Sequence, residues 1–316
     1  MISCMNEAAD DAHRRVAREV GGTDVVARLA ALSGSDFASL MLEVARRRAA
    51  RETPASMLRR YRDDRFARPG GTPWRTLRQA EELLLGCLPA DVEMVTVAPL
   101  VPLGTHSALG PVSQHKVVTT IRASEVAADP TNALALEAAA RRGPSTDGQR
   151  ATVRLATIQR VTRGQFFPAG FQAHFSLFAM VTAGRDEGSL RFEEAALRDH
   201  LGFAVAGLAA AGLPVQVALT PLSDNGERIV AAVAAGLGGT GAEVVTDRER
   251  EKGRGYYRDV CFKVNAVIGA EPVEIGDGGL TDWTARLLAN QKERLLISGY
   301  GLDGLARLLG GRGGHG

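Results

Sequence analysis

Two short stretches of the 316-residue chain hold the residues best suited to chemistry. The first, RGQFFPAGFQAHFSLFAMV (163–181), reads as the end of a strand, a turn with Pro168 and Gly170, and a returning strand. An arginine at the root of a hairpin, here Arg163, can grip a phosphate, and an aromatic side chain on the returning strand, here Phe175, can stack on a flat base. These two residues make a candidate nucleotide site.

The second stretch, KGRGYYRDVCF (252–262), contains two of the four tyrosines of the chain, preceded by the cations Lys252 and Arg254. Tyr256 and Tyr257 are expected to begin a strand. Adjacent residues of a strand point to opposite faces, so at least one of the two rings could be simple packing. The other is then a candidate wall of a pocket.

The composition sets bounds on the class of protein. Hydrophobic residues make up 45% of the chain, charged residues 23%, and the net charge is +2, as in an ordinary globular protein with no global demand for a nucleic acid or a membrane. No apolar run is long enough to span a bilayer, and the start lacks the apolar region of a signal peptide. The three cysteines are far apart without CxxC spacing, which argues against a zinc site or disulfides and favours a reducing cytoplasm.

The chain divides at a cluster of helix breakers. We expect an N-terminal helical segment over residues 1–70, the breaker cluster RPGGTPW at 68–74, and a larger domain over 74–316. The N-terminal segment is rich in arginine, which could contact RNA phosphates. Acidic residues are interleaved with the arginines, so a solvated helix surface is the favoured interpretation.

Two helix starts can be assigned within the N-terminal segment. Either Ser35 or Asp36 can cap the helix that carries the apolar pattern of SDFASLMLEVARRRAAR. Thr53 can cap the next helix, with Pro54 at its first position.

Beyond residue 74 the pattern predicts an α+β fold. Strands are as often neighbours joined by short turns as partners across a helix, which favours an antiparallel sheet with helices against it. The expected strands are 92–104, 116–123, 152–161, 171–181, 256–269, 272–279 and 294–300. A strand, a helix and a further strand are also expected between the long helix that ends at residue 212 and the tyrosine stretch. The expected helices are 76–88, 130–142, 190–212, 282–290 and 302–311.

The hairpin at 163–181 resembles motif 2 of the class II aminoacyl-tRNA synthetases of the histidyl type, which reads F-R-x-E-R-P-x-x-G-R-x-R-E-F-x-Q-F. Without a gap, Arg163 falls on the arginine that holds the α-phosphate, Gly170 on the turn glycine and Phe175 on the phenylalanine that stacks on adenine. Gln165 replaces the carboxylate of the motif and His174 a glutamate. The resemblance implies that this hairpin binds ATP.

The tyrosine stretch resembles the family element R-G-L-D-Y-Y-T-x-x-V-F-E, whose tyrosines line the amino-acid pocket. Tyr256 and Tyr257 take the two tyrosine places. Lys252 aligns with the arginine that assists the α-phosphate, and Arg254 lies two residues on. The resemblance therefore implies a substrate role for the tyrosines and a catalytic role for Arg163 and the two cations.

Three weaker matches follow the order of the family. GGLTDWT resembles the pocket element G-G-R-Y-D-G-L and keeps Gly278, Gly279 and Asp282. AADPTNA echoes R-P-E-G-T-x-P, which puts Asp129 near the place of the carboxylate that binds the substrate amine and Thr131 on the threonine.

The third match is GLDGL, which begins at Gly301 and resembles motif 3, G-L-E-R-L. Gly301 thereby joins the expected nucleotide site, but Gly304 replaces the motif 3 arginine that grips the γ-phosphate, and Arg307 lies one turn on. The sequence ends soon after this motif, so we expect no anticodon-binding domain within it.

The resemblance, over about residues 74–310, implies a six-stranded antiparallel sheet flanked by helices. It also implies ATP and Mg²⁺ as cofactors and a homodimer through the first helix and strand, with Pro99 as the motif 1 proline. Leu280 and Thr281 replace the histidine-reading pair R-Y, so histidine specificity is not expected. Leu177 also replaces the glutamine of motif 2, and with these three replacements the pocket should suit a substrate less basic than histidine.

Simpler structural roles stay open for several of these residues. Asp129 before Pro130 is a good helix N-cap by itself, and Asp282 can cap the helix that follows it. A strand histidine such as His174 is most often only structural, and Phe175 could be a core aromatic.

Two functions remain open. The first is ATP-dependent activation of an amino acid or related small carboxylic acid as an acyl-adenylate, passed to a carrier protein, a small amine or a tRNA. The second is a non-catalytic, ligand-sensing role like that of the regulatory subunit of ATP phosphoribosyltransferase. The cations Lys252, Arg254 and Arg258 beside the tyrosines favour activation.

Overall fold

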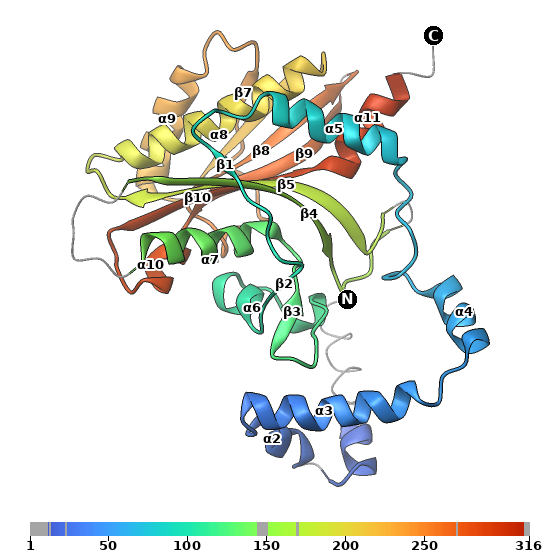
Figure 1. Ribbon diagram of the computed structural model, residues 1–316. Helices are drawn as coiled ribbons and strands as arrows, with labels where there is room; N and C mark the ends of the chain where they lie inside the picture. Colours follow the sequence, from blue (N-terminus) through green and yellow to red (C-terminus); the bar gives the residue numbers. More distant parts are fainter. Residues whose placement is uncertain are drawn as a thin grey trace. The chain divides into compact units, whose positions relative to one another are not determined.

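The computed structural model describes residues 12, 14–22, 24–143, 151–168, 171–269 and 271–312 (Figure 1). Gly170, the expected turn glycine, lies outside the described residues. Contacts divide the described chain into two compact units. Residues up to Asp63 together with Thr119–Ser124 form one unit, and residues 64–118 with those from Glu125 onward form the other.

The smaller unit contains the helices α2 (Val25–Ala30), α3 (Gly34–Ala49) and α4 (Pro54–Asp63). The N-cap of α3 is Ser33, whose hydroxyl accepts the backbone N–H of Asp36 at 3.1 Å. The expected caps Ser35 and Asp36 already lie inside this helix, so that assignment was two or three residues late. The helix takes up Gly34 as its first residue despite the low helix propensity of glycine.

The start of α4 agrees with its expected cap. The hydroxyl of Thr53 accepts the backbone N–H of Ser56 at 3.2 Å, and Pro54 is the first helical residue. On α3 the guanidinium groups of Arg46 and Arg47 both donate to Glu43 at 2.7 Å. These arginines are therefore paired on the helix surface, as their interleaving with acids suggested.

The larger unit is built on one eight-stranded sheet in the order β1-β4-β5-β10-β9-β8-β6-β7. Its strands are β1 (Glu93–Met94), β4 (Val153–Thr162), β5 (His174–Arg185), β10 (Glu293–Gly301), β9 (Glu271–Thr281), β8 (Arg258–Ile268), β6 (Val215–Pro221) and β7 (Glu243–Thr246). The inner six strands are antiparallel throughout, while β1 and β7 each add a short parallel strand at an edge.

The expected count of six strands is thus two too low. The extended segment expected at 92–104 contains Pro99 and Pro102, and it yields only the two residues of β1 and the short strand β2 (Leu100–Pro102). Proline removes a ladder hydrogen bond, which keeps both pieces short and at an edge. The strand expected at 116–123 is also missing. A 3₁₀ turn, η1 (Gln114–Lys116), stands at its start, and β3 (Ser124–Val126) begins only after Ala123, whose φ of 52° interrupts an extended chain.

Helices cover both faces of the sheet (Figure 1). On one face lie α5 (Trp74–Gly86), α8 (Arg191–Ala210), α9 (Asp224–Gly236) and α11 (Leu302–Arg312), and on the other lie α7 (Pro130–Arg142) and α10 (Trp283–Leu287). Each face has its own hydrophobic core. The short helix α6 (Thr105–Leu109) precedes η1. Among the described residues, none of the helices is long and apolar enough to cross a membrane.

A buried ion pair joins the end of α7 to the start of β10. The guanidinium of Arg142 donates twice to the carboxylate of Glu293, with NH2 to Oε1 at 3.2 Å, and once to the carbonyl of Ala151 at 3.0 Å. The Arg142 side chain is 2% exposed and that of Glu293 8%. The pair fixes the position of the end of α7 against the sheet. The start of α7 carries residues of the site described below.

Replacing Glu293 by alanine should therefore be costly, because it leaves the buried guanidinium of Arg142 without its counter-charge. We expect a loss of about 3–5 kcal/mol in the free energy of unfolding, measured by urea denaturation. The matched control is Glu137→Ala, which removes a carboxylate from an exposed pair with Arg141 and should cost less than about 1 kcal/mol. Equal losses in the two variants would contradict the assigned importance of the buried pair.

Candidate functional site

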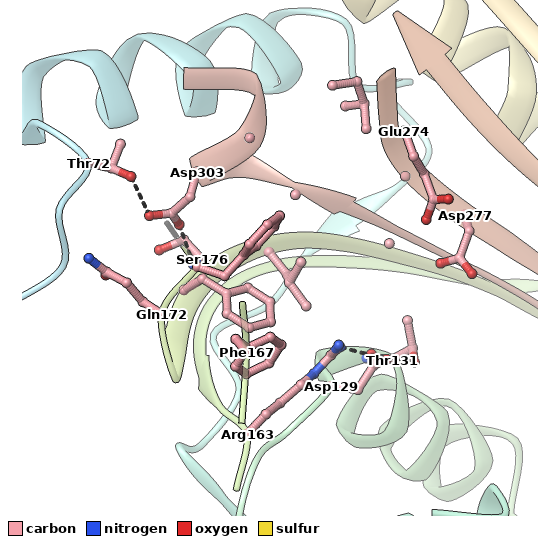
Figure 2. A pocket seen from close by; sticks show the side chains of 18 of the residues that line it. Thr72, Asp129, Thr131, Arg163, Phe167, Gln172, Ser176, Glu274, Asp277 and Asp303 are labelled. Atoms are coloured by element: carbon pink, nitrogen blue, oxygen red, sulfur yellow. Dashed lines mark hydrogen bonds and ion pairs between the residues drawn. The ribbon is translucent and has the colours of Figure 1, made fainter. Parts of the chain in front are cut away.

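A cavity of about 520 Å³ lies in the larger unit (Figure 2). Its volume is within the range usual for small-molecule sites. Its walls come from the start of α7, the β4–β5 hairpin, the turn before β8, strands β9 and β10, and the start of α11. Of the residues discussed from the sequence, it is lined by Asp129, Thr131, Arg163, Phe175, Leu177, Tyr256, Tyr257, Gly301, Gly304 and Arg307.

Arg163 lies directly after β4 and enters the cavity from the hairpin root. Its Nε donates to the carbonyl of Ala128 at 2.9 Å, and the centre of its guanidinium is 5.0 Å from the ring centroid of Phe175. Its NH2 is 3.8 Å from Oδ2 of Asp129. One donor and one face of the guanidinium are thus fixed by the protein, while the terminal nitrogens are available for a ligand anion.

Asp129 both caps a helix and lines the cavity. Its Oδ1 accepts the backbone N–H of Thr131 at 2.9 Å and the hydroxyl of Thr131 at 2.7 Å. The capping role therefore uses one carboxylate oxygen. The other oxygen faces Arg163 at 3.8 Å, so the structural role and a ligand-binding role are compatible.

A buried histidine holds the backbone on which both residues depend. The Nε2 of His106 accepts the N–H of Ala128 at 3.0 Å, and its Nδ1 lies 2.6 Å from Oε1 of Glu125. Because Nε2 accepts, the ring proton is on Nδ1 and is donated to the carboxylate. The peptide of Ala128 is therefore held on its N–H side by His106 and on its carbonyl side by Arg163. This pair could not be predicted from the sequence, since its members are 19 residues apart and outside every motif.

The two tyrosines do not point to opposite faces as expected. Their rings lie 4.9 Å apart at 75°, and both line the cavity. The reason is that Tyr256 lies in a turn and Tyr257 just before β8, so strand alternation does not apply. Tyr256 also packs edge-on against Trp283 at 5.2 Å. Burial raises the pKa of both phenols well above 10, so both stay neutral hydrogen-bond donors.

Lys252 and Arg254, the cations expected beside the tyrosines, do not line the cavity. Arg254 donates instead to the carbonyls of Arg250 and Arg248, both at 2.8 Å, and Lys252 is exposed on the same turn. The cation beside the wall is Arg250, whose NH2 is 3.2 Å from Asp277 and whose guanidinium lies 5.8 Å from the ring of Tyr257. The gap-free match to the family element thus pointed to Lys252 and Arg254, and it missed the buried Arg250.

Three other expected substrate residues are not among the described residues that line the cavity. A Cβ at Gly279 would lie 2.6 Å from the ring of Tyr257, and one at Gly278 would collide with the carbonyl of Ile297. These glycines make room for the ring and for the neighbouring strand. Asp282 is paired with Arg258 at 2.7 Å and Arg286 at 3.5 Å.

Gln165 and His174 also lie outside this cavity. The carbonyl of Gln165 accepts NH1 of Arg65 at 2.6 Å. The Nδ1 of His174 accepts Nε of Arg160 at 2.8 Å, so its Nε2 donates to the carbonyl of Arg68 at 2.6 Å. His174 lines a second, smaller cavity of about 350 Å³ on the outer side of the hairpin.

Sequence reasoning missed the acidic wall of the main cavity. Glu274 and Asp277 of β9 both line it, although residues three apart on a regular strand face opposite sides. The ladder between β8 and β9 shifts register between Val264 and Asn265, which places an irregularity at this part of β9. A β-bulge of this kind reverses the alternation, and it has no clear mark in a single sequence.

A further carboxylate, Asp303, holds the wall together. Its Oδ1 accepts the hydroxyl of Thr72 and its Oδ2 the N–H of Ser176, both at 2.7 Å (Figure 2). Asp303 is therefore occupied by the protein itself, and it ties the loop before α5 to the hairpin and to α11. Within the described part of the chain, no group of three or more His, Cys, Asp or Glu is arranged to hold a metal ion.

Comparison with known proteins gives matches at the level of structure alone. No family model matches the chain, and no curated protein is similar to it in sequence. Apo histidyl-tRNA synthetase of S. aureus matches 76% of this chain with a TM-score of 0.57 at 14% identity, and 66% of its own length is covered. The chain has the fold of a histidyl-type class II synthetase core.

Two further structures share this class II synthetase-like fold. A protein of Bacillus halodurans titled ATP phosphoribosyltransferase regulatory subunit/histidyl-tRNA synthetase has a TM-score of 0.59 at 13% identity, over 77% of this chain and 83% of its own. A histidine–tRNA ligase subunit of Alicyclobacillus acidocaldarius has a TM-score of 0.56 at 14% identity, over 78% of this chain and 96% of its own. At these identities the likeness concerns the fold alone.

The buried pair behind Ala128 predicts a dependence of stability on pH. Burial alone would raise the pKa of Glu125, but hydrogen bonds from the N–H of His106, Gln114, the His106 ring and the N–H of Gly104 lower it below the ordinary 4.5. A lowered folded-state pKa means that Glu125 stabilises the protein above pH 4.5 and that this contribution fades as the pH falls through the folded-state pKa. At pH 7 we expect Glu125→Gln to lose about 2 kcal/mol of unfolding free energy.

Urea denaturation of both proteins at a series of pH values from 7 to 3 measures this effect. The difference between wild type and Glu125→Gln should stay constant down to about pH 4.5 and then shrink. A difference that is the same at pH 3 and pH 7 would contradict an ionised Glu125 in the folded state.

Proposed function

We propose that the cavity binds an amino acid or a closely related small carboxylic acid, and that the protein acts as a ligand-sensing relative of the class II synthetases. The observation that carries the proposal is that Arg163, Asp129 and the tyrosines 256 and 257 open onto one cavity. A guanidinium suits the carboxylate of such a ligand, and the carboxylate of Asp129 suits its ammonium. The neutral phenols and aliphatic walls suit its side chain.

The charges of the cavity favour sensing over activation. Four carboxylates line it, and the cations among the described lining residues are Arg163 and Arg307. A triphosphate gains little in such surroundings, because like charges in a partly desolvated cavity repel. Lys252 and Arg254 were the cations that favoured activation. Arg254 donates to a carbonyl of the chain itself, and Lys252 is exposed. The printed name of the B. halodurans protein joins a regulatory subunit to this fold, which supports the same choice.

A sensing role requires a partner protein that responds when the ligand binds. The resemblance suggests self-association through the first helix and strand, α5 and β1, and a regulated enzyme as a further partner. A homodimer with one cavity in each subunit is therefore part of the proposal.

ATP-dependent activation is the second candidate, and Arg307 is the observation in its favour. It lines the cavity one turn beyond Gly304, and its guanidinium lies 5.6 Å from the ring of Phe171. In this function Arg163 would hold the α-phosphate and Phe175 the adenine. Mg²⁺ would take oxygen ligands from the phosphates and from Glu274 or Asp277. A carboxylate oxygen of the acid would attack the α-phosphorus, and pyrophosphate would leave.

Ligand-dependent thermal shift distinguishes the two functions. With a sensor, at least one amino acid at about a hundred times its Kd should stabilise the protein by about 2.7 kcal/mol without ATP. The variant Arg163→Gln should bind at least tenfold more weakly, because a charged hydrogen bond to the ligand carboxylate is lost. Arg185→Gln, at the far end of β5, is the matched control and should bind as the wild type does.

Pyrophosphate exchange completes the test. Exchange that depends on an amino acid would establish activation and overturn sensing as the primary function. The absence of a shift with any of the twenty amino acids, ornithine or citrulline would overturn the proposed ligand class.

Gly304 allows a direct test of the missing nucleotide contact. A Cβ there would meet no heavy atom within 4 Å, so a side chain can begin at this position without a clash at its Cβ. We expect Gly304→Arg to increase the thermal shift caused by Mg-ATP, since it supplies a cation where the family has one. Gly304→Ala, the control, should leave the ATP response unchanged and raise stability by about 0.5–1 kcal/mol. An identical ATP response in both variants would show that the cavity does not take a triphosphate in this orientation.

A further inference from the structure

We propose that the ligand is a dibasic amino acid, with an ammonium or guanidinium at the end of its side chain that lies between Asp277 and Glu274. This inference rests on the proposed binding of an amino acid in the cavity and names the class of that ligand. It also reverses the expectation of a less basic substrate, which was drawn from Leu280, Thr281 and Leu177. Leu280 and Thr281 are buried and are not among the described residues that line the cavity, whereas Leu177 does line it.

The two ends of the cavity differ in what they offer. Arg163 and Asp129 extend from one side, and Glu274 and Asp277 extend from β9 on the other (Figure 2). The first side matches the carboxylate and α-ammonium that every amino acid carries. The second side has two carboxylates, each of which has one cationic partner in the protein, Lys263 for Glu274 and Arg250 for Asp277.

Asp277 is only partly neutralised by the protein. Arg250 divides its donors among the carbonyls of Lys252 at 2.8 Å and Phe262 at 2.9 Å and a single contact to Oδ2 of Asp277 at 3.2 Å. The hydroxyl of Tyr257 reaches the same oxygen at 3.3 Å. Among the described residues, no hydrogen bond to Oδ1 of Asp277 is found. The side chain of Asp277 is 43% exposed and lines the cavity, so its carboxylate can be reached by a ligand.

The neighbouring carboxylates make the binding of a cation beside Asp277 more favourable. Desolvation raises the pKa of Asp277, Arg250 lowers it in part, and the negative charges of Glu274 and Asp129 raise it further. Glu274 itself is paired with Lys263 at 3.2 Å and is half exposed. A second cation of the ligand would relieve this repulsion, which a neutral side chain would not.

The uncharged part of the lining suits an aliphatic chain with a cationic end. The rings of Tyr256 and Tyr257 line the cavity, and their electron-rich faces favour a nearby ammonium or guanidinium. Ile275, Leu177 and Ile297 supply apolar surface for methylene groups.

The test compares matched ligands by isothermal titration calorimetry. Ornithine, lysine and arginine are measured against the neutral analogues norvaline, norleucine and citrulline. At least one basic amino acid should bind at least tenfold more tightly than its neutral analogue. Asp277→Asn and Glu274→Gln should each reduce that preference about tenfold. Glu271→Gln, on the same strand but away from the cavity lining, should keep it.

The outcomes separate this inference from the function on which it rests. If neutral amino acids bind and the basic ones gain nothing, the dibasic class is overturned while amino-acid binding stands. If none of the six binds and none of the other amino acids does, the proposed function fails as well. A preference that survives in both variants would overturn the assignment to Asp277 and Glu274. Glu274 is exposed, so Glu274→Gln keeps the test valid if Asp277→Asn does not fold.

Discussion

The peptide of Ala128 is the point on which the site depends. Its N–H is bound by the ring of His106 and its carbonyl by Arg163, while the next residue, Asp129, begins α7. Two cavity-lining residues of opposite charge are therefore positioned by one peptide unit. A buried carboxylate, Glu125, fixes the tautomer of the histidine that holds it. A buried polar network is stable only when each of its groups has a hydrogen-bond partner. Removing Glu125 or His106 should therefore disturb the positions of both Arg163 and Asp129.

The pocket shows how one fold can support different tasks. Its position between the hairpin, β9, β10 and α11 is set by the backbone, whereas its charge is set by a few side chains. Among the described lining residues the cations are Arg163 and Arg307, and two acids, Glu274 and Asp277, come from β9. A change of this kind alters the ligand without altering the sheet, which is why the fold alone does not determine function.

Regular elements could be predicted from the sequence because their signals are local. The helix at 130–142 agrees residue for residue with α7, where Asp129 and Pro130 form a cap and first turn. The hairpin strands β4 and β5 and the antiparallel character of the inner sheet also follow from periodicity and short turns. Arg163, Phe175 and the two tyrosines, singled out by type and spacing, do share a cavity.

The features that could not be predicted depend on contacts distant in sequence. The bulge on β9, which turns Glu274 and Asp277 to one side, is set by pairing with β8. The partner of Asp277 is Arg250 and not Lys252 or Arg254, because the turn before β8 folds back on itself through side-chain bonds to carbonyls. The edge strands β1 and β7 have only two and four residues, and the sequence did not show how little of the extended segment expected at 92–104 would pair with the sheet.

These two short strands have a consequence for assembly. They are the outermost members of the sheet, so the edge strand at either border is short. A long exposed edge strand can pair with a strand of another chain, and short edge strands limit this pairing. Two copies of this molecule that met along α5 and β1 would accordingly be joined by side chains, and the sheet itself would end within each copy.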